Sequence, residues 1–331
     1  MAFPKERDLI VRGQDTIQGW LCLETRTEES WLDHNNHVNF RKYLGMVGLA
    51  TDYLCESVLT PGPESETEEP PTFFTLEART RYIKELLVDQ DVRVYVTPID
   101  RTEKTLRALV RIYRVDSKGR GKDKPELSAE SEWTGAFIDP VSRKVTPLPE
   151  AAREIFEEKL AKLETPYEAP SYPRGYDLPE PPAEKLVVSA GGKVIPADVD
   201  RMGHVGVERY TQLFLMGNIG YLTAIGLRDR VFAKPEFGKF LLASQIRYLE
   251  ELRAGDEYTV LSRMLWVRRK TAAYHHRMYR IRDGVETLAG TCTNTMGVAD
   301  LRIRKIIPLP DFLLENLSEI HGVELTREML S

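Results

Sequence analysis

The chain has 331 residues, a formal net charge of −5 and 42% hydrophobic residues. The length predicts two domains, and the slight acidic excess disfavours a nucleic-acid-binding protein, which usually carries a basic surface. The first residues lack the apolar core of a secretory signal, no apolar run approaches the roughly 18 residues of a membrane helix, and the three cysteines have neither metal-site nor disulfide spacing. We therefore expect a cytoplasmic protein that binds no nucleic acid and enters no membrane.

The first predicted element is a polar turn that leads into an apolar helix. The turn, WLDHNNHVN, holds one carboxylate, three amides and two imidazoles in nine residues. The helix that follows, residues 38–59, carries apolar side chains on most of its faces, which indicates that other structure surrounds it. Gly45 and Gly48 cost helix stability but would permit the close approach of a neighbouring backbone.

Strands are predicted to follow this helix. Residues 91–98 and 105–115 alternate apolar and polar side chains, as half-buried strands do, and residues 128–139 are a further candidate. Residues 149–164 then return to a helical pattern, led by Pro149. One helix followed by an antiparallel meander predicts an α+β layered fold.

A second copy of this pattern occupies the rest of the chain. Asp33–Tyr43 aligns with Asp200–Tyr210 at an offset of 167 residues, and Arg81–Leu86 aligns with Arg247–Leu252 at an offset of 166. A proline-rich stretch between the copies reads as a linker. Duplication therefore predicts three segments: a first domain at residues 1–164, a linker at 165–183 and a second domain at 184–331. Two further matches support the alignment, namely Arg111–Arg114 with Arg277–Arg280 and Pro147–Pro149 with Pro308–Pro310.

The polar turn resembles the D-x-N-x-H-x-N signature of acyl-CoA and acyl-carrier-protein thioesterases of the 4-hydroxybenzoyl-CoA thioesterase-like superfamily. The later segment FTLEARTRYIKEL resembles the T-x-E-x-H-x-x-Y motif of betainyl-CoA thioesterases, with Arg79 where that type tends to carry His. The resemblance implies a tandem double hotdog: two long helices, each wrapped by an antiparallel sheet, paired as a pseudo-dimer with the active site between the paired domains. In the first copy the two motifs are filled by Asp33, Asn35, His37, Asn39, Tyr43, Thr75, Glu77 and Tyr82.

The second copy keeps only part of these motifs. Asp200, His204 and Tyr210 remain. The substitutions at the other motif positions indicate that the second copy kept the fold and lost the chemistry. Helix capping would then require only the Asp and His that both copies share. At four other positions polar residues give way to apolar or small ones: Met202 for Asn35, Gly206 for Asn39, Leu241 for Thr75 and Ala243 for Glu77.

Thioester hydrolysis needs a carboxylate that activates water or attacks directly, and donors that stabilise the developing oxyanion. Asp33 is the predicted base or nucleophile, and Glu77 is the alternative. His37 would orient Asp33 or share its proton, and Asn35 would fix the water or the carbonyl. Helix capping is the competing explanation for Asp33 and Asn35. Asn39 and Thr75 complete the predicted catalytic group.

Substrate contacts are predicted at three places. Tyr43 is expected in the core with its hydroxyl near the site. Two strand-to-strand turns carry cations that suit the CoA phosphates or simply face solvent. These turn residues are Arg101 and Lys104 in the first copy and Arg268, Arg269 and Lys270 in the second.

Several alternatives stay open. The predicted substrate is an acyl-CoA, with a short polar acyl group implied by the betainyl-CoA resemblance, or an acyl-carrier-protein thioester. A hotdog hydratase or dehydratase and a non-catalytic acyl-CoA-binding module are the other candidates. His34 and His37 lack further ligands at metal-site spacing, and His275 and His276 on one strand should point to opposite faces. We expect no metal and no cofactor, and further association of pseudo-dimers into a homo-oligomer stays open.

Overall fold

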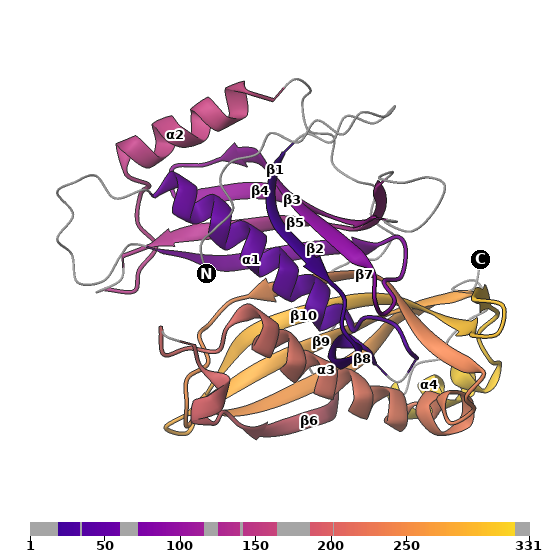
Figure 1. Ribbon diagram of the computed structural model, residues 1–331. Helices are drawn as coiled ribbons and strands as arrows, with labels where there is room; N and C mark the ends of the chain where they lie inside the picture. The colour runs from indigo at the N-terminus through magenta and orange to yellow at the C-terminus, as the bar shows by residue number, and fades with distance from the viewer. Residues whose placement is uncertain are drawn as a thin grey trace. The chain divides into compact units, whose positions relative to one another are not determined.

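The computed structural model describes residues 19–33, 35–59, 72–115, 125–139, 142–163, 186–200 and 202–321. The chain divides into two compact units, Met1–Pro170 and Ser171–Ser331. His34 and the predicted linker, residues 165–183, lie outside the described residues. Each unit is an α+β layer of a long helix against an antiparallel sheet (Figure 1), which confirms the tandem hotdog fold.

Unit 1 wraps a five-stranded antiparallel sheet around α1. Its strand order is β1-β3-β4-β5-β2, and each neighbouring pair of strands is antiparallel. Alternation places Val94, Val110 and Trp133 on the face that packs against α1, where they share one core with Met46 and Leu54. The elements are β1 (Trp20–Arg26), η1 (Glu29–Trp31), α1 (Phe40–Val58), β2 (Thr72–Tyr82), β3 (Asp91–Arg101), β4 (Thr105–Val115), β5 (Pro125–Ile138) and α2 (Glu150–Ala161).

Unit 2 repeats this arrangement around α3. Its strands follow the order β7-β10-β9-β8-β6, and β11 pairs with β10. Tyr221 of α3, Tyr274 of β9 and Leu313 of α4 lie in one buried cluster. The elements are β6 (Val187–Lys193), η3 (Pro196–Asp198), α3 (Val207–Ala224), η4 (Arg228–Phe232), β7 (Phe237–Tyr248), β8 (Glu257–Val267), β9 (Thr271–Arg282), β10 (Val285–Asp300), β11 (Lys305–Ile307) and α4 (Phe312–His321).

The predicted helices and strands are present, with bounds that differ by a few residues. The difference at the first helix affects the site. Val38 forms an isolated β-bridge with Leu32, and α1 begins only at Phe40. His275 and His276 face opposite sides of β9, as alternation predicts: His276 packs beside Phe214 of α3, whereas His275 bonds to Thr293 of β10.

The role predicted for Gly48 is wrong. A Cβ placed on Gly48 would meet no atom of the described residues within 4 Å, so no backbone among them approaches there. The close approach occurs instead in unit 2, at Gly220 of α3. A Cβ on Gly220 would overlap the carbonyl oxygen of Ser189, and a Cβ on Gly217 would lie 2.5 Å from the Val260 side chain. The helix of unit 2 therefore lies directly against β6.

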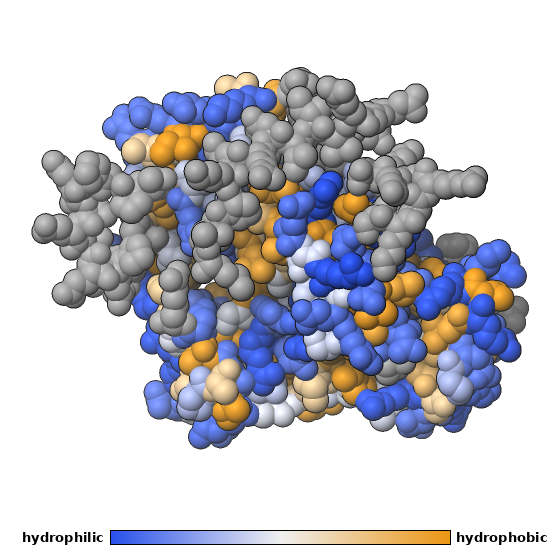
Figure 2. Space-filling model, viewed as in Figure 1, coloured by the Kyte–Doolittle hydropathy of each residue, from blue (hydrophilic) through white to orange (hydrophobic). Residues whose placement is uncertain are grey.

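Apolar side chains on the visible surface are interspersed with polar ones (Figure 2). The exposed large hydrophobic residues come from separate elements, for example Leu49 of α1 and Val285 of β10, as is usual for folded proteins. Within the described part of the chain, no helix combines the length and the apolar character that a membrane crossing requires.

Candidate active site

A tight loop before α1 presents Asp33 and His37. The loop closes through a hydrogen bond from Asp33 N to His37 O (2.9 Å) and the bridge between Leu32 and Val38. Asn36, at its tip, adopts a left-handed φ of 58°, which Asn tolerates better than most residues. The left-handed backbone conformation therefore accounts for one of the polar residues of the turn, Asn36.

The Asp33 carboxylate is held from two sides. Asn35 N donates to Asp33 Oδ1 at 2.8 Å, and His37 Nδ1 lies 3.4 Å from Asp33 Oδ2. Both side chains are largely buried, with 16% of Asp33 and 14% of His37 exposed. These two contacts orient the carboxylate within the loop that leads into α1. Asn35 is 5% exposed, so it is also buried.

Asn39 is the N-cap of α1. Its side-chain oxygen accepts a hydrogen bond from Arg41 N at 3.1 Å. This contradicts the interpretation that capping requires only the shared Asp and His. In unit 2, Gly206 occupies the N-cap position without a side-chain bond. The second copy, which has Gly206 in place of Asn39, therefore lacks the side-chain cap of its helix.

We predict that Asn39→Ala destabilises unit 1 by about 1 kcal/mol, because it leaves the Arg41 amide without its acceptor. Asn39→Gly should cost only a few tenths of a kcal/mol. Urea denaturation of both variants measures the difference. If Asn39→Gly abolished turnover while leaving the stability near that of the parent, Asn39 would have the catalytic role that the sequence predicts.

Tyr43 ties the Asp33 loop to the β2–β3 connection. Its hydroxyl accepts from Leu86 N at 2.9 Å, and Leu86 O accepts from Val38 N at 2.8 Å. Tyr43 is 4% exposed, and burial raises the pKa of its phenol well above the usual 10.0, which keeps it neutral. Tyr43 is thus a core residue with its hydroxyl near the loop, as predicted, and contact with substrate stays a prediction. Leu86 was not predicted as a site residue because it acts through its backbone, although the repeat marks it by its match to Leu252.

Thr75 and Glu77 face opposite sides of β2. A β-bulge at Leu76 separates the pairs Thr75–Gly135 and Glu77–Thr134, and it reverses the alternation. Thr75 accepts from Trp133 Nε1 at 2.9 Å on the α1 side of the sheet. Glu77 lies on the other face, 3.3 Å from Arg79 Nε. The motif that contains both residues implied a single catalytic group. Within unit 1, however, the two side chains point to opposite faces of the sheet.

The cationic turn of unit 1 lies far from Asp33 within that unit. Leu86, which bonds to the Asp33 loop, precedes one end of β3, and Arg101 lies at the other end. Eleven residues at about 3.4 Å each place these ends roughly 30 Å apart. Arg101 pairs with Glu157 of α2 at 2.8 Å, and Lys104 O accepts from Phe137 N.

The corresponding turn of unit 2 is also held by local contacts. The Arg268 guanidinium lies over the Trp266 ring at 4.8 Å, and Arg268 N bonds to Thr271 O. Arg269 O accepts from Leu309 N at 2.8 Å. Lys270 is the third cation of this turn. Phosphate binding by either turn stays a prediction.

The second copy reproduces the loop almost bond for bond. Asp200 N bonds to His204 O, Met202 N bonds to Asp200 Oδ1, and His204 Nδ1 lies 3.3 Å from Asp200 Oδ1. The left-handed position is Gly203, with φ 75°. Unit 2 therefore keeps the geometry of the Asp–His turn, although its carboxylate is more exposed, 39% against 16%.

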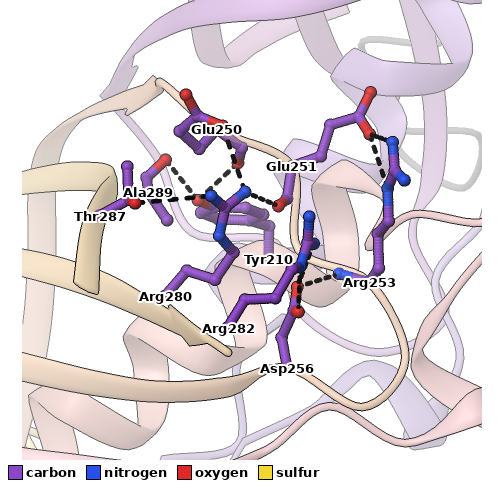
Figure 3. A network of polar contacts seen from close by, with 9 residues as sticks. All are labelled: Tyr210, Glu250, Glu251, Arg253, Asp256, Arg280, Arg282, Thr287 and Ala289. Carbon is purple, nitrogen blue, oxygen red and sulfur yellow. Dashed lines mark hydrogen bonds and ion pairs between the residues drawn. The ribbon is translucent and has the colours of Figure 1, made fainter. Parts of the chain in front are cut away.

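A network of polar contacts supports this second loop (Figure 3). Tyr210 donates to Ala289 O at 2.6 Å, whereas Tyr43 accepts from a backbone amide. Arg280 donates to the carboxylate of Glu250 and to the backbone oxygen of Glu251, each at 3.2 Å. These bonds fix the segment whose Leu252 O accepts from Val205 N, as Leu86 O does for Val38 N in unit 1.

Asp256 anchors the other end of this network. It accepts from Arg253 N and from two nitrogens of Arg282 at 2.6 and 2.7 Å. Burial raises the pKa of the Asp256 carboxyl, but the bonds from Arg282 and Arg253 outweigh burial and hold the pKa below its ordinary 3.8. Because the pKa of this carboxyl is lower in the folded than in the unfolded protein, its ionised form stabilises the fold at pH values above the unfolded pKa. This contribution is lost as the pH falls below 3.8.

We predict that Asp256→Asn lowers the free energy of unfolding by about 1–2 kcal/mol at pH 7, because charge-assisted bonds become neutral ones. The difference from the parent should shrink as the pH falls toward 3, which urea denaturation at pH 7 and pH 3.5 measures. Asp89→Asn is the control, because Asp89 has a side chain 75% exposed and pairs only at the surface. An equal loss in both variants would contradict the assignment.

No group of three or more His, Cys, Asp or Glu side chains among the described residues is arranged to hold a metal ion.

The model of the thioesterase-like superfamily matches this chain twice, at residues 28–156 and 194–317. The chain belongs to the thioesterase-like superfamily. The two matches contain the two Asp–His loops and their helices, so both copies are superfamily domains. A search of curated protein sequences found no match.

Solved structures similar to this tandem superfamily chain include three thioesterases. A putative oleoyl thioesterase from Lactobacillus plantarum has a TM-score of 0.59 at 13% identity, covering 83% of this chain and 94% of its own. An acyl-ACP thioesterase from Bacteroides thetaiotaomicron has 0.57 at 14%, covering 84% and 96%. The 12:0-ACP thioesterase from Umbellularia californica has 0.59 at 11%, covering 84% and 93%. At these identities the similarity shows the shared fold.

Proposed function

We propose that the chain hydrolyses an acyl thioester of CoA to the free acid and the thiol. The observation that supports this proposal is the Asp33 carboxylate, held by Asn35 N and His37 in the loop that leads into α1, in a member of the thioesterase-like superfamily. A carboxylate activates water for attack on the carbonyl carbon, and the positive helix end stabilises negative charge that develops on the carbonyl oxygen.

In the proposed reaction Asp33 accepts a proton from water while the oxygen of that water bonds to the carbonyl carbon. The tetrahedral intermediate then collapses, the carbon–sulfur bond breaks, and the thiolate takes up a proton. His37 orients Asp33 and shares its proton. Asp33 is favoured over Glu77 by its position in the D-x-N-x-H-x-N motif and by its contact with His37.

A short polar acyl group is the proposed substrate class, following the resemblance of the first copy to betainyl-CoA thioesterases. Acyl-carrier-protein thioester hydrolysis is the second candidate. It is favoured by the similarity to two ACP thioesterases, which extends over 84% of this chain and includes both units.

The test is hydrolysis of a panel by the purified full-length chain, with thiol release followed by a chromogenic thiol reagent. The panel contains betainyl-CoA, acetyl-CoA, dodecanoyl-CoA and oleoyl-CoA. It also contains the dodecanoyl and oleoyl thioesters of an acyl-carrier protein. Release from the short polar CoA esters supports the first candidate, and release from carrier-protein esters supports the second. Hydration of an enoyl-CoA without thiol release would instead indicate a hydratase, and saturable binding without turnover a binding module.

A further inference from the structure

One end of unit 2 carries far more positive charge than the matching end of unit 1. Three segments at this end of unit 2 contain nine Lys or Arg residues and four Asp or Glu residues, whereas the equivalent segments of unit 1 contain three and seven. The whole chain has a formal net charge of −5, so the excess of cations is local. The segments are residues 226–236, 268–270 and 300–311 in unit 2 and residues 60–71, 102–104 and 139–150 in unit 1.

The strand register brings the three segments of unit 2 together, and we call them the basic end of unit 2. Phe237, which follows the first segment, pairs with Asp300 at the end of β10, and Lys305 of β11 pairs with Asp300 as well. Arg269 O accepts from Leu309 N at 2.8 Å, so the β8–β9 turn lies against the third segment. Neighbouring strands lie about 4.8 Å apart, which is less than the Debye length of about 8 Å at physiological salt, so charges on neighbouring strand ends act together.

The basic end of unit 2 faces solvent. All of its cations except Arg268 are exposed, and the side chain of Arg302 is 69% exposed although it pairs with Asp300 at 2.5 Å. The Arg230 guanidinium lies over the Phe312 ring at 4.8 Å, as that of Arg268 does over Trp266. These aromatic contacts hold two of the cations in place without neutralising their charge.

An exposed apolar side chain lies in the middle of this charge. Ile303, between Arg302 and Arg304 in the β10–β11 turn, is 59% exposed. Arg302 N donates to Asp300 Oδ1 at 2.9 Å and Arg304 adopts a left-handed φ of 48°, so Ile303 is carried by an ordered turn. The unit 1 equivalent of Ile303 is Ser142. The second copy therefore presents an aliphatic group where the first presents a hydroxyl.

Cations around an exposed apolar side chain match the surface of an anionic lipid bilayer. Lipid phosphates attract Lys and Arg side chains, and the apolar boundary just below the headgroups accepts an aliphatic side chain. The charge alone would suit an acidic protein equally well. Ile303 favours the bilayer, because a fluid bilayer needs no pocket shaped for this side chain, whereas an acidic protein would need one.

We propose that the basic end of unit 2 is a docking surface for an anionic lipid bilayer, with its Lys and Arg side chains at the headgroups and Ile303 below them. This binding is peripheral and separate from the Asp33 loop of unit 1. It does not depend on thioester hydrolysis.

Sedimentation of the full chain with lipid vesicles tests the proposal. The chain should bind vesicles of equimolar phosphatidylcholine and phosphatidylglycerol, should not bind vesicles of phosphatidylcholine alone, and should be released as the salt concentration rises. Equal binding to both kinds of vesicle, or binding to neither, would overturn the proposal. Should the chain bind an acyl-carrier protein but not the anionic vesicles, the surface would belong to an acidic protein instead.

Two double variants separate the position of the charge from its amount. Lys270→Gln combined with Lys305→Gln should weaken binding to the anionic vesicles about 25-fold, because each cation near the surface contributes about fivefold. The matched control is Lys104→Gln combined with Lys144→Gln, the same change at the equivalent exposed positions of unit 1. The control should leave vesicle binding unchanged, and an equal loss in both double variants would contradict the proposed surface.

Ile303→Ser installs the unit 1 residue without changing the charge. It should weaken binding to the anionic vesicles about tenfold, because the apolar contact is lost. Unchanged binding would mean that Ile303 does not reach the bilayer and would overturn the lipid assignment. The unfolding transition of each variant, measured alongside, checks that these exposed substitutions leave the fold intact, and the comparison of anionic with neutral vesicles uses the unmodified chain and decides without any variant.

Discussion

Asp33→Asn should lower kcat for thioester hydrolysis by about 10²–10⁴-fold, the range that a positioned acid–base group contributes. Asparagine keeps an oxygen that accepts from Asn35 N, so the loop should stay folded, but it cannot take a proton from water. Steady-state thiol release, with the unfolding transition measured in parallel, separates a chemical effect from a structural one.

Asp200→Asn is the matched control, because the second copy holds Asp200 in the same bonds. Its effect on kcat should remain within about threefold, since the neighbouring Asn35 and Asn39 of the first copy are Met202 and Gly206 here. If Asp200→Asn reduced turnover as strongly as Asp33→Asn, the chemistry would not belong to the first copy alone. If neither variant lost activity, the role proposed for Asp33 would be wrong.

Gly220→Ala should destabilise unit 2 by about 2–3 kcal/mol, whereas Gly48→Ala should stabilise unit 1 by about 0.5–1 kcal/mol. A methyl group added at Gly220 would overlap the backbone oxygen of Ser189, so α3 must shift away from β6. No atom of the described part of the chain lies within 4 Å of a Cβ on Gly48, so we expect the helix preference for alanine to decide the effect there. Urea denaturation, followed by circular dichroism, measures both differences.

The two substitutions are the same chemical change in equivalent helices, so each serves as the control for the other. A stabilising Gly220→Ala would mean that α3 does not press on β6 in solution. A destabilising Gly48→Ala would restore the close approach that the sequence predicts at that position.

The duplication and the element order could be predicted because both depend on local patterns. Alternation marks strands such as β3 and β4, and the turn Asp33–His37 carries its own hydrogen bonds, so its residues are adjacent in the sequence. The repeated Asp–His spacing, 33–37 and 200–204, corresponds to the same loop in both units. Local interactions of this kind leave a readable spacing in the sequence.

The faces of β2 could not be predicted, because they depend on pairing with β5. Thr75 and Glu77 are two residues apart, which places them on one face of a regular strand. The bulge at Leu76 exists only in the register with Gly135 and Thr134, and it separates them. The cap at Asn39 escaped prediction for a related reason, since the helix start that it caps is fixed by the bridge of Val38 to Leu32.

By itself the sequence determined a duplicated α+β chain of the thioesterase type with its Asp–His turn complete in the first copy, because short-range spacing encodes these features. The tertiary structure alone decided which groups meet. It directed Glu77 away from Thr75, tied Tyr43 to Leu86, and joined Ser189, Ser262 and His276 in the core of unit 2. The physical reason is that strand register and helix packing set such contacts, and residues far apart in the chain carry no mutual pattern that a single sequence reveals.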